Sequence, residues 1–487
     1  MVSNTALALA TQIVSAALTA LLTLYLTRAL KPHAFGQFSL AVSVASVLIV
    51  FVDAGIAVST PRFIAERRSD HSYGARILSN ALTFKLATGL VTSIVLVALA
   101  VPLADAYGDH GLVWPFRAIA IALFGQNLLM LFSSALVAVE RIAANLLLYF
   151  SESVVETVAS ILLVALGGGA VGAVFGRAAG YVAGGAAAMI IGARVFGWRA
   201  IRPRRPESDL MRPLLSYAGV LFVVSGAYTL FSQIDIILIG VFKGSAEVAF
   251  FSAPLRLCAL LHYPGLAIQN SVAPRLARSE DREPDVRSFV IALRLLVILQ
   301  AAMCAPALVW AGPIIHLLLG SAYAPAAPVL RGLVPFLFLQ GLGPVVSTGV
   351  NFLGESRQRI WIAIAAFVID LILDVILIPP LGALGGAIAT SVAYAVYVPA
   401  HLLICRRLLG VSLRPLAVST ARSLTAAAAA AGILALVGTS SLSVADWAVG
   451  AVGGTAAFTL VLLATREVRS SELRIVWAWV QARRAAA

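Results

Sequence analysis

Hydrophobic positions in this chain gather into fourteen stretches of about bilayer-spanning length, separated by short polar segments. A membrane-spanning helix needs about 20 predominantly apolar residues. The pattern therefore predicts an all-α polytopic membrane protein with fourteen transmembrane helices and no segment long enough to fold as a soluble domain. We place these helices near residues 6–27, 38–60, 81–104, 117–139, 145–166, 170–193, 213–242, 248–272, 288–311, 329–352, 360–378, 383–405, 416–437 and 444–465.

Charged residues divide the connecting segments into two alternating classes. Segments on one side of the predicted membrane are rich in arginine, whereas the segment at 312–328 on the other side carries no charge. The positive-inside rule assigns the arginine-rich side to the cytoplasm, so both termini are predicted there. The net charge of +13 then reflects topology and contact with anionic membrane lipid, and it predicts no nucleic-acid partner.

Composition supports the membrane assignment and excludes several classes of site. The chain is 61% hydrophobic and 12% charged, whereas soluble domains contain about 25% charged residues. Cys258, Cys304 and Cys405 all lie in apolar stretches without the spacing of metal ligands. The histidines are scattered, and no phosphate-binding loop or catalytic constellation is visible. We therefore predict a protein that is not an enzyme and needs no cofactor.

The chain contains an internal repeat. One constant offset along the sequence aligns Pro61-Arg62 with Pro274-Arg275 and Tyr181 with Tyr394. Each copy holds six helices, an even number, so both enter the membrane in the same sense around an axis along the membrane normal, with a binding site between them. The predicted parts are an N-terminal six-helix lobe (1–200), a basic linker (201–212), a C-terminal six-helix lobe (213–410), two extra helices (411–465) and an interfacial cytoplasmic tail (466–487).

Several local motifs resemble those of a transporter family. They are TRALKP at 27–32 with FGQF at 35–38, DAG at 53–55, YAPAAPVLR at 323–331 and IPPLGALGGA at 378–387. Their order and spacing over roughly residues 1–410 are similar to those of polysaccharide and O-antigen flippases in the multidrug/oligosaccharidyl-lipid/polysaccharide exporter superfamily. The resemblance implies a monomeric flippase of the bacterial cytoplasmic membrane that carries a polyprenyl-pyrophosphate-linked glycan, with contacts to glycan assembly proteins.

Polar groups in the C-terminal lobe lie at a common predicted depth. Asp235, Asp370, Asp374 and Thr390 fall near ~12 Å from the outer helix ends at 1.5 Å per residue. Ionisable residues at this depth usually mark functional sites. The lipid II flippases, which this lobe resembles, carry a sodium site on these helices. That resemblance implies a cation site formed by Asp235, Asp370, Asp374, the Gly386 carbonyl and Thr390. Both Na⁺ and H⁺ stay open as the coupling ion. The structural alternative is that these acids form ion pairs with arginines.

Arginines are the candidates for binding the pyrophosphate, because guanidinium groups bind phosphate in a bidentate manner. Arg256 is the first candidate, since it lies about eight residues inside its predicted helix. Arg28, Arg62, Arg117 and Arg331 lie near helix ends, where snorkelling towards water is the alternative explanation. Arg28 and Arg62 are candidates through the resemblance, and Arg117 and Arg331 through equivalent positions in the two lobes.

Other charged residues inside the predicted helices have structural interpretations. We predict that Lys85 and Arg422 are interfacial anchors. Glu152 and Glu156 lie four residues apart, and a structural pair with Arg177 is the favoured interpretation. Two interpretations stay open for the acid at position 53, either an acid in a cavity or a partner of Arg28.

Two other functions compete with the flippase. One is a cation-coupled multidrug antiporter of the same superfamily, although a pocket for cationic drugs would favour acids and aromatic residues over arginine. The other is a membrane-embedded glycosyltransferase or polymerase, which needs a sizeable extramembrane loop. The outer segments at 105–116 and 312–328 are too short for that chemistry.

Overall fold

The computed structural model describes residues 2–67, 70–260, 262–272, 285–352 and 356–468. All regular elements in these ranges are helical. Ten helical runs among the described residues are long and apolar enough to cross a membrane, so the chain is a multi-pass membrane protein. Most of the predicted interfacial tail, from residue 469 onward, lies outside the described residues.

Two of the ten runs each contain two predicted helices. The run Ala17–Glu66 covers the first two predictions, and Ile142–Phe196 covers the fifth and sixth. In the first run, α1 (Val2–Asp53) leaves helical geometry at Lys31, where φ is 57°. In the second, α5 (Ile142–Leu163) and α6 (Gly169–Phe196) meet at a π-helical turn in which Gly167 has φ 89°. Both interruptions fall between predicted helices.

Two further predicted helices, at 248–272 and 329–352, are broken into short pieces. At 1.5 Å per residue, the 16 residues of the longest piece span about 24 Å, less than the ~30 Å hydrocarbon core. The two interrupted helices and the two runs that each cover two predicted helices account for the difference between ten runs and fourteen predicted helices. The count of fourteen stays a prediction. The pieces are α8 (Ser245–Leu260), α9 (Tyr263–Val272), α12 (Ala326–Gly332), α13 (Val334–Gln340) and α14 (Gly343–Phe352).

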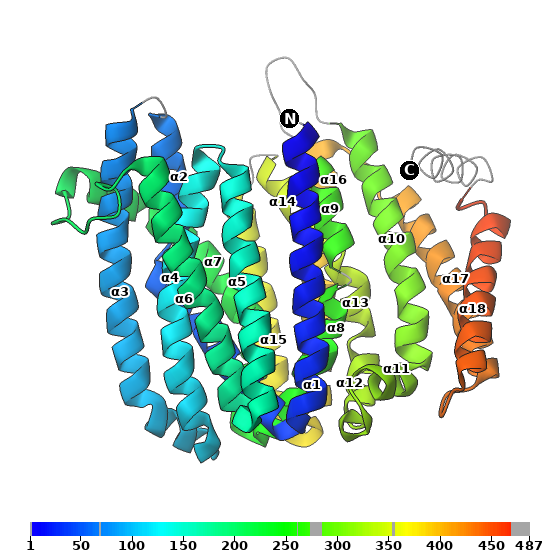
Figure 1. Cartoon of the computed structure of the whole chain (residues 1–487). Coiled ribbons are helices and arrows are strands. Elements are labelled where there is room, and N and C mark those ends of the chain that lie inside the picture. Colours follow the sequence, from blue (N-terminus) through cyan, green and yellow to red (C-terminus); the bar gives the residue numbers. More distant parts are fainter. Residues whose placement is uncertain (1, 68–69, 261, 273–284, 353–355, 469–487) are drawn as a thin grey trace. The chain divides into compact units, whose positions relative to one another are not determined.

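The chain forms two compact units, and the first comprises residues 1–253 and 371–386. Within it α3 (His71–Ala106), α4 (Val113–Ala138), α6 and α5 pack side by side (Figure 1). Small residues allow this close packing: a Cβ on Gly125 of α4 would lie 2.6 Å from the backbone of Tyr181 in α6. A further helix, α7 (Ser208–Lys243), packs against α1 in the same unit.

The second unit comprises residues 254–370 and 387–487. In it α10 (Val286–Val309) packs against α17 (Arg414–Val437), which packs against α18 (Val444–Ala464) (Figure 1). Trp310, which follows α10, donates its indole N–H to the Gly438 carbonyl at 2.9 Å and contacts Trp447 edge-on. The remaining helices are α11 (Ala311–Leu318), α15 (Ser356–Leu381) and α16 (Ala383–Leu409), and the last two contribute residues to both units. The predicted six-helix lobes follow other boundaries and stay a prediction.

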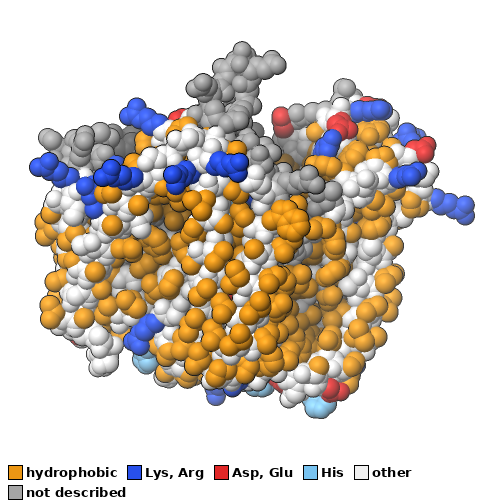
Figure 2. Space-filling view, turned by 180° about the vertical axis from the view of Figure 1, so that it is seen from behind, with side chains coloured by type: hydrophobic (Ala, Val, Ile, Leu, Met, Phe, Trp, Pro, Cys, Tyr) orange, Lys and Arg blue, Asp and Glu red, His pale blue; other side chains and the backbone are white. Residues whose placement is uncertain are grey.

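The surface matches a lipid environment. Figure 2 shows hydrophobic side chains over most of the face in view, with lysines and arginines gathered along one rim. On α3, Leu90, Val91 and Ile94 are each 55–59% exposed. Exposed apolar surface of this extent is unfavourable in water, and it identifies the side of α3 that faces lipid tails.

Candidate functional site

Three carboxylates from α7 and α15 lie together in the protein interior. Asp235 is 3% exposed, and Asp370 and Asp374 are fully buried. One oxygen from each of the three lies within 4.8 Å of the others. We call these three residues the acidic cluster. The structure thus brings together the three acids that the sequence analysis assigns to a cation site.

The pattern of α15 explains why two of these acids point inward. Residues four apart occupy one helix face, so Asp370 and Asp374 share a side. On the opposite side, Ile372, Val375 and Ile376 are 50–59% exposed. The helix therefore presents apolar side chains to lipid and carboxylates to the protein interior.

The other two predicted members lie on α16. A Cβ placed on Gly386 would lie 3.0 Å from Ile239, which follows Asp235 by one turn on α7. The absence of a side chain at Gly386 thus lets α16 approach α7 closely. Thr390, one turn beyond Gly386, is 5% exposed. The structure places both on the helix turn predicted for them, and it places Gly386 next to the helix of Asp235.

Electrostatics limits the ionisation states that the acidic cluster can adopt. Like charges this close disfavour full ionisation of all three carboxylates, and a bound proton or cation would reduce the net charge. Carboxylate, carbonyl and hydroxyl oxygens are hard ligands that suit an alkali cation or a proton rather than a soft metal. The chemistry of the cluster therefore fits a proton or an alkali cation.

The arginine candidates in the first unit are Arg28, Arg62 and Arg117. Arg28 is exposed. Arg62 stacks on the Tyr217 ring at 4.3 Å and pairs with Glu66 at 3.1 Å. Arg117 lies over the Trp114 ring at 5.2 Å, and its buried Nε has no hydrogen-bond partner among the described residues.

Two of these arginines lie near opposite ends of α3. Arg62 lies on α2 (Ile56–Glu66), just before α3 begins, and Arg117 follows its end. At 1.5 Å per residue, the 36 residues of α3 extend about 54 Å. One pyrophosphate therefore cannot contact Arg62 and Arg117 at the same time.

The second unit contains Arg256 and Arg331. Arg256 is half-buried on α8, one turn before that helix ends. Burial raises the pKa of the Tyr323 phenol, and the positive charge of Arg256 opposes this shift, which places the two groups near each other. Arg331 is exposed, and its Nε donates to the Leu308 carbonyl at 3.1 Å. Arg256 is therefore the less exposed of these two candidates.

One interpretation of a charged residue is wrong. Lys85, predicted as an interfacial anchor, is fully buried. Its ammonium pairs with the Asp53 carboxylate and donates to Asn127 Oδ1 at 2.6 Å. This pair also identifies a partner of Asp53. The depth of Lys85 in its helix could have indicated this burial from the sequence. Lys85 lies several turns from either end of α3, which is beyond the reach of a snorkelling side chain.

Two other charged groups have defined partners. Arg177 donates to Glu156 at 2.6 Å, which confirms the predicted pair. Arg422 pairs with Glu467 at 3.3 Å, and Arg294 pairs with the same carboxylate at 2.6 Å. Burial acts to raise the pKa of Glu467, but the bonds from Ser419 and the two arginines lower it overall. Arg422 thus joins α17 to the segment after α18.

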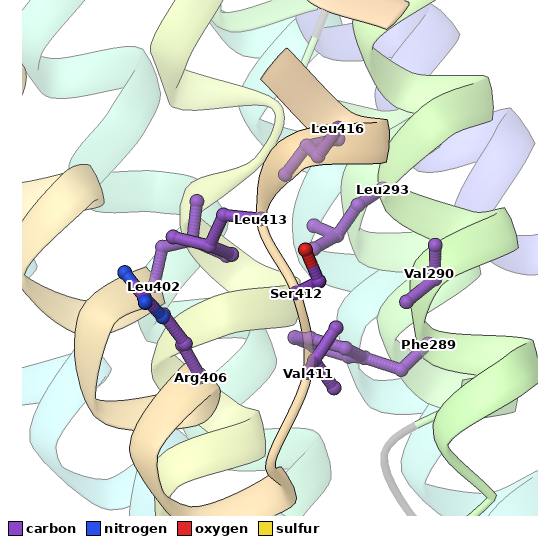
Figure 3. A pocket seen from close by; sticks show the side chains of 9 residues that line it. All are labelled: Phe289, Val290, Leu293, Leu402, Arg406, Val411, Ser412, Leu413 and Leu416. Carbon is purple, nitrogen blue, oxygen red and sulfur yellow. The ribbon is translucent and has the colours of Figure 1, made fainter. Parts of the chain in front are cut away.

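A small pocket in the second unit has a different character. Figure 3 shows it between α10, α16 and the start of α17, with Arg406 the one charged side chain among the nine that line it. Its other lining groups are apolar except for Ser412. This chemistry fits helix packing and does not fit recognition of a pyrophosphate.

Sequence comparison identifies a matching family and two relatives named as a flippase and a transporter. Residues 1–280 match the family described as polysaccharide biosynthesis protein, and residues 221–376 match MatE. "Probable low-salt glycan biosynthesis flippase Agl15" of Haloferax volcanii is 23% identical over 278 residues, 56% of this chain and 58% of that relative. "Putative O-antigen transporter" of Shigella flexneri is 23% identical over 385 residues, 76% of this chain and 88% of that relative. The chain thus matches little more than half the length of the first relative.

Solved structures show the same fold. Lipid II flippase MurJ in its inward closed conformation superposes with a TM-score of 0.77 at 13% identity, over 95% of this chain and 99% of that one. An inward-facing multidrug resistance MATE family transporter superposes with a TM-score of 0.65 at 17% identity, over 81% of this chain and 95% of that one. At these identities the similarity shows a shared fold, and the residues must decide the cargo.

Proposed function

Because the chain belongs to the polysaccharide biosynthesis protein family, we propose that it is a flippase for a lipid-linked oligosaccharide. The cargo is a polyprenyl-pyrophosphate-linked glycan, which the protein moves across the cytoplasmic membrane by alternating access. The match to this family over residues 1–280 carries the proposal. The names of the two curated relatives, a glycan biosynthesis flippase and an O-antigen transporter, support it. The protein acts as a transporter and not as an enzyme.

Arg256 is the proposed pyrophosphate ligand. It is half-buried, and a guanidinium supplies the paired donors that a phosphate oxygen pair accepts. Arg62 and Arg117, near opposite ends of α3, are proposed to meet the cargo at entry and release. The exposed Arg28 and Arg331 are proposed to attract the anionic headgroup.

The acidic cluster is the proposed coupling site. Na⁺ or H⁺ binding would relieve repulsion among its carboxylates and so favour one conformation over another. A membrane potential adds about 2.3 kcal/mol per charge per 100 mV to such a step. We further propose a monomer in a bacterial cytoplasmic membrane with both termini in the cytoplasm, which contacts glycan assembly proteins.

A multidrug antiporter is the second candidate, because residues 221–376 match MatE and MATE transporters share the fold. The arginine candidates disfavour it, since a cationic drug would be repelled where a pyrophosphate is attracted.

The test is deletion of the gene followed by analysis of lipid-linked intermediates and surface glycans. We expect a polyprenyl-pyrophosphate glycan to accumulate on the cytoplasmic side while its surface product is lost. Unchanged glycans with increased drug sensitivity would instead establish the antiporter. In the complemented strain, Arg256→Ala should abolish export, and Arg256→Lys should restore only part of it, because one ammonium replaces a bidentate group.

A further inference from the structure

A break in a membrane helix is held open by buried polar groups. The helix predicted at 38–60 ends as α1 at Asp53 and resumes as α2 at Ile56. Between them Ala54 has φ 47° and Gly55 has φ 77°. A positive φ is uncommon for alanine and indicates that the surrounding structure imposes this conformation. Lipid cannot satisfy the backbone groups that such a break exposes.

Side chains satisfy backbone groups on both sides of the break. The Asp53 carboxylate accepts the backbone N–H of Ala57, in the first turn of α2, at 3.0 Å. The Thr88 hydroxyl, from α3, donates to the carbonyl of Val52, in the last turn of α1, at 2.9 Å. The break is therefore built into the fold rather than being local fraying.

An ion pair and an amide fix Asp53 in this role. The Lys85 ammonium pairs with Asp53. Asn127 of α4 accepts from that ammonium at 2.6 Å and donates to the Lys85 backbone carbonyl at 2.7 Å. Lys85 and Asn127 are both fully buried. We call Asp53, Lys85 and Asn127 the hinge network.

The segment beyond the break carries one of the proposed substrate ligands. The residue before α2 packs closely on α7: a Cβ on Gly55 would lie 2.3 Å from the Ala218 carbonyl oxygen. Further along, Phe63 meets the Tyr217 ring with centroids 6.3 Å apart, and Arg62 stacks on the same ring. The angle of α2 at the break therefore decides where the Arg62 guanidinium lies.

The second copy of the repeat contains a similar arrangement. The offset that aligns Tyr181 with Tyr394 also takes Asn127 to Gln340, which is 4% exposed. The side-chain amide of Gln340 donates through Nε2 to the Cys258 backbone carbonyl near the end of α8 at 2.7 Å. The backbone carbonyl of Gln340 contacts Nδ1 of His262, between α8 and α9, at 3.0 Å. The pair α8 and α9 is the repeat equivalent of the helix at 38–60, and it carries Arg256. Its interruption at His262 precedes the position equivalent to Ala54, which lies within α9. In each repeat, then, a buried amide at the same position is linked to an interruption of an arginine-bearing helix, although the two interruptions lie at different positions.

We propose that Asn127 and Gln340 are repeat-equivalent positioning residues, which fix these two breaks and thereby the orientation of Arg62 and Arg256. In the first repeat the amide acts through the Asp53–Lys85 ion pair. This inference rests on the proposed function, because it concerns arginines assigned to the cargo.

Disulfide formation in the full chain tests the first hinge directly. In a background with Cys258, Cys304 and Cys405 replaced by alanine, the pair F63C/Y217C reports the position of α2 on α7. We expect Asn127→Ala and the double variant D53L/K85M to slow cross-linking at least about fivefold. The double variant removes the carboxylate that caps Ala57, and N127A removes the amide that holds Lys85 against Asp53. The double variant leaves no buried charge unpaired, which protects folding. Lys85→Arg should keep the wild-type rate.

Asn80→Ala is the matched control. Asn80 is also fully buried and makes two hydrogen bonds, to Arg76 at 2.9 Å and from Glu207 at 2.6 Å, without contacting the break. If N127A and D53L/K85M cross-link as fast as N80A, the positioning role is wrong.

Glycan export separates this inference from the proposed function. Arg62→Ala in the otherwise native chain should abolish export. The same substitution added to the F63C/Y217C chain should leave the rate of disulfide formation unchanged. Slow cross-linking in N127A together with full export in R62A would uphold the hinge and refute the role of Arg62. In the second repeat, the similarly sized Gln340→Met has no donor for the Cys258 carbonyl and should reduce export at least about tenfold at normal abundance. Unchanged export would exclude Gln340.

Discussion

At the scale of the residue, several ionisable side chains inside the described helices occur in pairs or clusters. Lys85 pairs with Asp53, Arg177 with Glu156, and three aspartates form the acidic cluster. Isolated charges in hydrocarbon are costly, so pairing and clustering are the expected solutions. The cluster differs from the pairs because it concentrates charge of one sign, which is suited to binding a proton or a cation.

We predict that Asp374→Asn reduces glycan export at least about tenfold and changes its dependence on Na⁺ or pH, because one of the clustered carboxylates is lost. Export by the reconstituted protein, measured across Na⁺ and pH gradients, checks this. Ile372→Ala is the control, since Ile372 lies on the lipid-facing side of the same helix at 53% exposure. An unchanged cation response in D374N would show that the cluster is structural.

A second residue-scale prediction concerns Asp109, between α3 and α4. Burial acts to raise the pKa of this carboxyl, but bonds from Ser245 at 2.6 Å and Gln37 at 3.0 Å lower it overall. A lowered folded-state pKa means that the stabilisation is present above the ordinary value of 3.8 and is lost as the pH falls through the lower folded value.

Asp109→Asn should therefore lower the unfolding temperature at about pH 7, and the difference from the wild type should shrink as the pH falls to about 3. Thermal unfolding in detergent measures this. Asp105→Asn, at a carboxylate with 51% side-chain exposure, should have little effect. A difference for D109N that stays constant over the whole range would rule out the carboxylate as its source.

At the scale of the element, interruptions and close crossings give the helices their roles. The breaks after Asp53 and Leu260 turn two predicted helices into jointed segments. Elsewhere, missing side chains allow backbones to touch, as where Gly265 would place a Cβ 2.3 Å from the Gly341 carbonyl oxygen. Such contacts fix helix positions more strictly than apolar packing alone, because backbone atoms cannot move aside.

The crossing of α4 and α6 provides an element-scale prediction. In Gly125→Ala the new methyl group would lie 2.6 Å from the backbone of Tyr181, so the helices must separate, at a cost of about 1–3 kcal/mol. The variant should unfold at a lower temperature than the wild type. Gly219→Ala is its control, because nothing lies within 4 Å of the added Cβ. Equal unfolding temperatures for the two variants would contradict the close crossing.

At the scale of the whole molecule, a multi-pass helical fold presents apolar side chains to lipid and gathers lysines and arginines along one rim of the face in view (Figure 2). The proposed topology places the segment at 199–207 in the cytoplasm and the one at 438–443 outside, on the positive-inside rule.

Cysteine labelling of intact cells tests that topology. In the chain without native cysteines, a membrane-impermeant maleimide should label S440C and leave R205C unlabelled until the membrane is opened. Both positions are exposed in the structure. The reverse pattern would invert the assigned orientation and with it the direction of transport.

Several features of this protein's structure could be determined from its sequence alone. Hydropathy depends on local composition, so the membrane class and most helices could be predicted from it. The depth and spacing of Asp235, Asp370 and Asp374 could also be read directly, because a helix converts residue number into distance. The pair of Glu156 with Arg177, on successive helices, was predicted as the favoured interpretation of these charges. A single constant offset along the chain identified the repeat that relates Asn127 to Gln340.

Only the tertiary structure decided which groups meet and where helices break. Lys85 was predicted to reach the membrane interface, but the packing of α3 against α4 encloses it with Asp53 and Asn127. The break at Ala54 is stabilised by groups from α3 and α4, which are distant in sequence, so no local pattern revealed it. Residue spacing measures distances along one helix, whereas contacts between helices depend on how their faces pack.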